Sequence, residues 1–146
     1  MQSLLNDEAY NQIKERLNAI KPETSRVWGK METPQMFKHC QLPLITGINK
    51  EPVKPKVGLM ARIFKKSMYS DRLWKKNMLT PKRFRMVDHY DFNNEKQKLS
   101  DLIDAFHARK VDQDWQPHPM FGDFTKDQWG KMQYKHLDHH FRQFGV

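Results

Sequence analysis

The stretch that decides the fold is the last one, Thr125–Val146, whose sequence is TKDQWGKMQYKHLDHHFRQFGV. Thr125 and Gln128 form a capping-box pattern, which marks the start of a helix. Gly145 stands where such a helix would take its C-terminal cap. At about 100° per residue, the apolar side chains share one broad face: Trp129, Met132, Tyr134, Leu137, Phe141 and Phe144. We therefore expect an amphipathic helix that packs its apolar face inside a helical bundle.

Three histidines lie in this predicted helix. His136 and His140 are four residues apart within the apolar face, so their imidazoles project together and can reach one metal ion. His139 is rotated toward the polar boundary and is the weaker candidate. An i, i+4 pair alone is more often two core histidines bonded to backbone or water. A further histidine, His39, lies on another predicted helix and strengthens the metal hypothesis.

The composition indicates one domain that spans residues 1–146 and is long enough to bury a core. With 38% hydrophobic and 29% charged residues, no run reaches the roughly 18 apolar residues of a membrane span. The N-terminus lacks the basic start and apolar centre of a signal peptide. The only cysteine, Cys40, excludes an internal disulfide. We therefore expect a cytoplasmic protein in which any metal is held by nitrogen and oxygen.

Three further long helices are predicted upstream of the last one. Caps and prolines set their expected ends: Asn6 and Pro22 for the first, Thr33 and Pro34 with Pro43 or Gly47 for the second, and Asn93 or Asn94 and Arg109 for the third. Four long helices with short first and last connections predict an all-α four-helix bundle. More than forty residues separate the second and third helices. This crossover is long enough to leave those two helices parallel.

Residues 49–92 form an irregular middle that carries most of the positive charge. Residues 51–90 hold eleven basic and three acidic side chains, a net charge of +8 out of +9 for the chain. A short basic amphipathic helix is expected in this segment, with an apolar face of Leu59, Met60, Ile63, Phe64 and Met68. Such a segment is usually a solvated edge that covers part of a bundle. Contact with phosphate or anionic lipid is the alternative interpretation.

Three stretches combine unusual residues in a fixed register: Trp28–Met31 and Thr33–Met36 leading to His39, His118–Pro119 with Phe121–Gly122, and Thr125 with Trp129–Gly130 and Tyr134–Val146. In these stretches the chain resembles the DinB/YfiT-like superfamily of metal-binding four-helix bundles, especially a branch described only as a domain of unknown function. The resemblance implies an up-down-down-up bundle with His39, His136 and His140 as ligands. It also implies a homodimer and a divalent ion, with zinc or nickel preferred over iron or manganese. Some relatives are thiol-dependent transferases.

Other side chains could assist this site. Gln143, one turn beyond His140, could hydrogen-bond a ligand or bound water. His118 could approach the ion as an acid or base, although a surface-loop histidine is the simpler expectation. Cys40 points about 100° away from His39 on the helix, so we expect it to pack rather than react.

These patterns favour a metal-dependent enzyme that acts on a small molecule. Three neutral imidazoles leave an open coordination position, as in catalytic zinc sites. The resemblance implies thiol-dependent transfer, with a low-molecular-weight thiol as a partner, and the open position also suits hydrolysis by metal-activated water. Two other classes stay open. Residues 54–85 could bind nucleic acid or an anionic surface, although no nucleic-acid-binding motif is present. The metal could also serve stability alone.

Overall fold

The computed structural model describes residues 2–78 and 80–146, and these residues contain helices but no β-strand. The α-helices are α1 (Asp7–Ala19), α2 (Thr33–Ile48), α3 (Leu59–Met68), α4 (Phe92–Ala108) and α5 (Lys126–Gln143). Two short 3₁₀ helices, η1 (Lys82–Phe84) and η2 (Arg109–Val111), lie in the connections. The prediction of an all-helical protein is confirmed.

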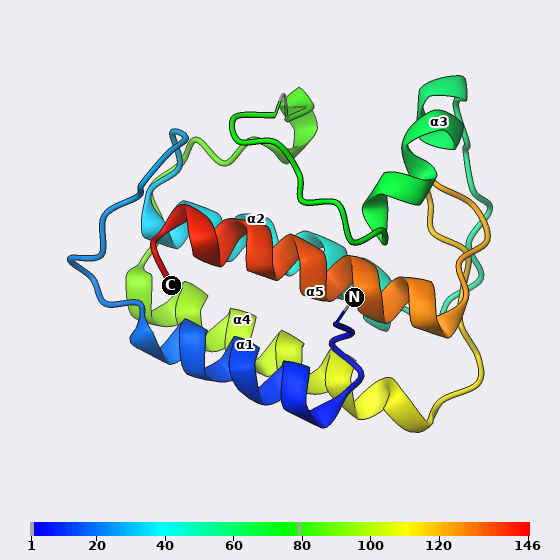
Figure 1. Ribbon diagram of the computed structural model, residues 1–146, viewed down its shortest axis with the longest axis horizontal. Coiled ribbons are helices and arrows are strands. Elements are labelled where there is room, and N and C mark those ends of the chain that lie inside the picture. Colours follow the sequence, from blue (N-terminus) through cyan, green and yellow to red (C-terminus); the bar gives the residue numbers. More distant parts are fainter. Residues whose placement is uncertain (1, 79) are drawn as a thin grey trace.

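The four long helices α1, α2, α4 and α5 lie alongside one another (Figure 1). Helices α2 and α1 each pack against both α4 and α5. Followed along the colour bar of Figure 1, α1 and α5 run in one direction and α2 and α4 in the opposite one. The connection between α2 and α4, with α3 and η1, passes over the side of the molecule formed by α2 and α5 (Figure 1).

The helix ends follow from their capping chemistry. The Thr125 hydroxyl accepts the Gln128 N–H at 3.2 Å, and the Gln128 side chain accepts the Thr125 N–H at 3.0 Å, so the predicted capping box forms. Helix α4 begins at Phe92, slightly before the expected start. The reason is the Asp91 carboxylate, which accepts the Asn94 N–H at 2.7 Å and serves as the cap.

The second helix begins at a different cap from the expected one, and it continues past Pro43 to end next to Gly47, the later of its two expected ends. Its N-cap is Glu32, not Thr33, and the Thr33 hydroxyl instead donates to the Thr24 carbonyl at 3.0 Å. The helix also continues through Pro43 to Ile48. A helix tolerates an interior proline at a cost, because the ring removes one backbone donor. The Pro43 carbonyl accepts a hydrogen bond from the Gln133 side chain of α5 at 2.6 Å.

Glycines allow close approach at two packing points of the long helices. A Cβ on Gly47 would lie 2.7 Å from the Phe106 ring of α4, and one on Gly130 would lie 2.1 Å from the Ser3 hydroxyl. The N-terminal segment crosses α5 there, since the Leu4 N–H donates to the Gly130 carbonyl at 3.0 Å. These contacts fix the positions of α2 and α5, which carry the candidate site.

All four long helices contribute to the buried core, whose largest fully buried apolar side chains are Leu4, Ile13, Leu17, Ile20, Met36, Phe37, Leu44, Leu99, Ile103, Phe106, Trp129 and Phe141. Burying a side chain of this size contributes about 1.5–3 kcal/mol. The helical fold therefore has a source of stability that is independent of any bound ion. Among the described residues, no helix has the length and apolarity that crossing a membrane requires.

Candidate metal centre

Three histidines from two helices converge between α2 and α5. The ligand atoms of His39, His136 and His140 all lie within 4.8 Å of one another. The His39 and His136 Nε2 atoms are 3.2 Å apart. The centroid of the His140 ring is 4.7 Å from each of the other two ring centroids. These three side chains could hold a metal ion.

A backbone carbonyl fixes the orientation of His39. Its Nδ1 lies 3.1 Å from the Phe84 carbonyl oxygen, which can only accept a hydrogen bond. The ring proton of neutral His39 is therefore on Nδ1, and Nε2 presents a lone pair to the cluster. A hydrogen bond of this kind on the far ring nitrogen is the usual support of a metal-ligating histidine.

His140 has a comparable support from α5 and from the loop before α2. Its Nδ1 lies 2.9 Å from Gln143 Oε1, and Gln143 Nε2 donates to the Trp28 carbonyl at 2.9 Å. Because the Gln143 amide gives its N–H to Trp28, its oxygen faces His140. The His140 ring proton is therefore on Nδ1, which leaves the Nε2 lone pair free.

Gly29 makes the contact between Gln143 and Trp28 possible. It has φ of +83°, a conformation that other residues rarely adopt. A Cβ at this position would lie only 2.2 Å from Gln143 Nε2. The Trp28-Gly29 pair thus has a physical role in orienting His140, even though neither residue is close to it in sequence.

His136 differs from the other two because its Nδ1 is buried and finds no hydrogen-bond partner among the described residues. Its Nε2 faces the lone pair of His39 Nε2 at 3.2 Å. Two imidazole lone pairs at that distance repel unless a proton or a cation lies between them. The ring protons of His39 and His140 lie on Nδ1, away from the cluster, so they do not compete with an ion for the Nε2 lone pairs. A donor set of three imidazoles fits a divalent transition metal.

Burial keeps the cluster in the neutral state that metal binding needs. It lowers the pKa of His140 to about 3, and the neighbouring His39 adds to this effect. The pKa of His136 is also well below its ordinary value, mainly through burial and then through repulsion from His140 and His39. Burial lowers the pKa of His39 too, against the opposing effect of the Phe84 carbonyl. All three imidazoles are therefore uncharged at neutral pH.

A cavity of about 500 Å³ lies beside the cluster, with His39 and His136 in its wall. Its other lining residues are mostly apolar: Leu42, Pro43, Thr46, Met68, Trp74, Pro81, Arg83, Phe84, His118, Pro119, Met120, Phe121 and Met132. Arg83 supplies a positive charge, and the described lining residues include no Asp or Glu. The size and the apolar wall are typical of small-molecule sites.

His118 lies in the cavity wall and not on the surface, so the expectation of a surface-loop histidine is wrong. It is 8% exposed and packs against the Trp129 ring at 5.1 Å between centroids. Its Nδ1 accepts the N–H groups of Met120 at 3.1 Å and Phe121 at 3.3 Å. Pro117 and Pro119, which flank His118, gave no indication that the chain turns here and brings the Met120 and Phe121 N–H groups to the ring. Burial lowers the pKa of His118 to about 4, so it is neutral and carries its proton on Nε2.

The remaining candidates lie nearby with different contacts. His139 is half-buried between the Trp28 and Trp74 rings, at 6.1 and 5.6 Å, and is not one of the three converging ligands. Cys40 is fully buried, with its Sγ 3.7 Å from Met36 Sδ. Burial raises the pKa of its thiol. Cys40 therefore packs in the core, as expected.

The basic segment 49–92 covers the histidine cluster. The sequence patterns did not predict that this segment would contribute to the site. Trp74 lies edge-on to His136 at 6.0 Å between centroids. Lys135 holds the same segment by donating to the Ser67 and Ser70 carbonyls at 2.6 and 2.8 Å. Together with the Phe84 carbonyl, these contacts make the crossover a wall of the site.

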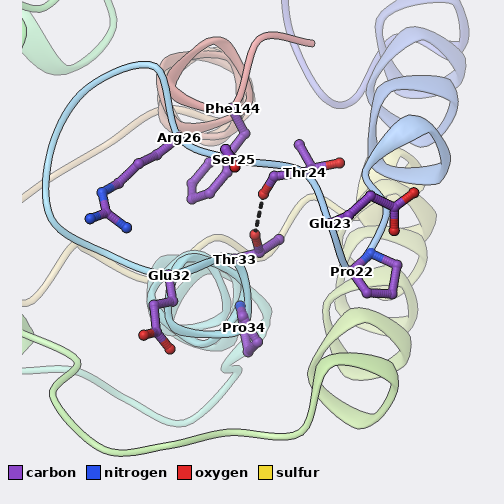
Figure 2. A pocket seen from close by; sticks show the side chains of 9 residues that line it. All are labelled: Pro22, Glu23, Thr24, Ser25, Arg26, Glu32, Thr33, Pro34 and Phe144. Atoms are coloured by element: carbon purple, nitrogen blue, oxygen red, sulfur yellow. Dashed lines mark hydrogen bonds between the residues drawn. The ribbon is translucent and has the colours of Figure 1, made fainter.

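A second cavity, of about 510 Å³, lies at the start of α2 and shares no lining residue with the first. Figure 2 shows it between the loop 22–26, the first residues of α2 and the Phe144 ring, with the hydrogen bond from Thr33 to Thr24 across it. None of the candidate site histidines lines it. The histidine cluster and the cavity beside it therefore form the candidate site.

The model of a family described as "Protein of unknown function (DUF1569)" matches residues 2–145. No curated protein and no solved structure matches the chain.

Proposed function

We propose a divalent-metal site in this protein, which belongs to the family described as "Protein of unknown function (DUF1569)". The ligands would be His39, His136 and His140, and the ion zinc or nickel, with iron or manganese as alternatives. One observation carries this proposal. The Phe84 carbonyl and Gln143 hold two imidazoles with their Nε2 lone pairs toward the third. Neutral imidazoles are good ligands for these metals.

We further propose that the site is that of a metal-dependent enzyme, either a thiol-dependent transferase or a hydrolase. When bound, the ion would act as a Lewis acid and lower the pKa of a thiol or water. The cavity supports this proposal, because His39 and His136 line it and a small molecule inside would reach the ligands. Its apolar wall would exclude water, Arg83 would attract an anionic group, and the His118 Nε2–H would donate a hydrogen bond.

The DinB/YfiT-like superfamily and its up-down-down-up four-helix bundle also remain proposals. The helix directions in Figure 1 support the second of them. A low-molecular-weight thiol as partner and a homodimer rest on the sequence resemblance. Cytoplasmic location rests on the composition and the single cysteine.

The metal proposal is tested by elemental analysis of protein purified without a nickel column. We expect about one divalent ion per chain, and close to none after His136→Ala or His140→Ala. His107→Ala is the matched control, because His107 bonds the Leu4 carbonyl and Asp7 away from the cluster. Its metal content should stay normal. Full metal content in the two cluster variants would refute the site.

The enzyme proposal requires an exchangeable position on the ion. Cobalt-substituted protein should therefore change its visible spectrum when a small thiol is added. His118→Phe should retain the metal but lower turnover of thiol or ester substrates if the Nε2–H contacts the substrate. An ion with four protein ligands and no exchangeable position would instead indicate a structural site.

A further inference from the structure

Helix α3 exposes its apolar side. Leu59 is 74% exposed, Met60 61%, Ile63 63% and Phe64 46%. At 100° per residue these four side chains share one arc of the helix. Every residue of α3 is at least partly exposed. A contiguous exposed apolar patch of this kind usually marks an interaction surface.

The side of α3 that faces the bundle is held by a charged residue. Lys65 donates to the Asp123 carbonyl at 2.5 Å, and its ammonium lies 5.5 Å from the centre of the Phe124 ring. Met68, at the end of the helix, packs partly against the core. Figure 1 shows α3 standing above the end of α5 where that helix begins. The helix is therefore inverted relative to an ordinary surface helix, which buries its apolar side.

Positive charges border the exposed apolar arc. Arg62 and Lys66 lie beside this arc on the helix surface, next to Leu59. Lys54 and Lys56 lie in the preceding loop. Arg62 and Lys66 are exposed. An apolar strip edged by cations is the pattern of a helix that lies in the interface of an anionic membrane.

We propose that α3 docks this protein onto an anionic phospholipid bilayer. Leu59, Met60, Ile63 and Phe64 enter the boundary between headgroups and acyl chains, and the bordering cations contact lipid phosphates. The helix has only ten residues, so the attachment is reversible and needs both the apolar and the ionic contacts. This attachment does not require the proposed metal site.

The charges favour a membrane over the other occupants of this surface. A symmetric dimer through α3 would bring Arg62 and Lys66 near their own copies, and like charges repel. A nucleic acid would meet the cations but would leave Leu59 and Ile63 in water. An anionic bilayer satisfies both features of the surface.

The test is co-sedimentation of the protein with vesicles. Binding should occur to phosphatidylcholine vesicles that contain phosphatidylglycerol, should be at least tenfold weaker with phosphatidylcholine alone, and should fall with added salt. Leu59→Ser with Ile63→Ser should weaken it about tenfold or more. Arg62→Gln with Lys66→Gln should weaken it severalfold.

Two variants elsewhere serve as controls. Val111→Ser removes an apolar side chain that is 75% exposed, and Lys98→Gln removes a cation of α4. Both should bind vesicles as the unaltered protein does. Equal binding by α3 and control variants, or no binding to anionic vesicles at low salt, would overturn the proposal.

If the apolar arc of α3 contacted protein and not lipid, other measurements would show it. A dimer that the Leu59→Ser, Ile63→Ser protein loses, measured by light scattering, would show that α3 binds a second copy. A large fall in melting temperature for the same protein would show that the apolar arc packs within the fold. Either result would overturn the membrane proposal.

Discussion

Two buried polar groups in this protein, the Arg109 guanidinium and the histidine cluster, are built in opposite ways. Arg109 begins η2 and is 4% exposed. It donates to the Gly47 carbonyl at 2.6 Å, the Asp112 carboxylate at 2.9 Å and the Asp114 carbonyl at 2.5 Å. Its guanidinium also lies 4.2 Å from the centre of the Trp115 ring. Arg109 thus has acceptors in three directions and ties α2 to the connection before α5.

The histidine cluster has only part of its hydrogen-bonding capacity satisfied. His39 and His140 each use Nδ1 for an acceptor, whereas the buried Nδ1 of His136 finds none among the described residues. A buried polar group without a partner usually costs stability. The difference teaches that polarity in a core does not itself indicate function. The satisfied group stabilises the fold, and the unsatisfied cluster is the one available to a ligand.

The largest effect should come from the satisfied group. Arg109→Met should lower the free energy of unfolding by about 3 kcal/mol, because the Gly47 carbonyl loses its partner in the core. Urea denaturation measures this change, and metal content per folded chain should be normal. Lys110→Met is the matched control, since the exposed Lys110 ammonium pairs with the Asp7 carboxylate and lies 3.2 Å from His107 Nε2, away from the core. If both variants were equally stable, the contrast between the two polar groups would fail.

A smaller effect should follow from loosening the cluster without removing a ligand. Gln143→Leu should weaken metal binding by about 10- to 100-fold, because His140 loses the hydrogen bond that orients it. Competition with a chelator measures the affinity. Gly29→Ala should act in the same direction, since the new methyl group would displace Gln143.

Gln41→Leu separates orientation of His140 from general destabilisation. Gln41 is also a buried amide, but it bonds to Glu95 at 2.7 Å and not to a histidine. Its loss should reduce stability and leave metal affinity unchanged. An equal loss of affinity in Gln41→Leu would mean that the Gln143 effect is not specific.

The smallest effect distinguishes the two polar groups most sharply. His136→Leu should abolish metal binding, yet the metal-free protein should be as stable as the unaltered one or more stable by about 1 kcal/mol, because an unpartnered nitrogen leaves the core. The measurement is thermal unfolding in the presence of EDTA. His107→Leu should be destabilising in the same assay, since both of its ring nitrogens are bonded. A large loss of stability in His136→Leu would make the cluster structural.

Local patterns in the sequence predicted the parts of the structure that depend on local chemistry. The Thr125–Gln128 capping box placed the start of α5, and the spacing of His136 and His140 put both on one helix face. Thr33 was a wrong choice of cap because Glu32, one residue earlier, fulfils that role. Adjacent polar residues compete for one cap position, so single-residue precision is not available from the pattern.

The rest depends on contacts between distant segments, which no local pattern specifies. The Phe84 carbonyl that orients His39 is a backbone group 45 residues away in sequence, and any residue could provide it. The burial of His118 depends on how the loop 116–124 packs on Trp129. Periodicity identified the apolar face of α3, but it could not show that this face points away from the bundle.

The Phe84 carbonyl would also make the crossover a thermodynamic partner of a metal ion bound at the histidine cluster. If the ion stabilises the arrangement in which Phe84 meets His39, then any ligand that moves this segment must change metal affinity by some factor. By reciprocity, the metal must change the affinity for that ligand by the same factor. The long connection between α2 and α4 would therefore couple any ligand that moves Phe84 to the occupancy of the histidine cluster.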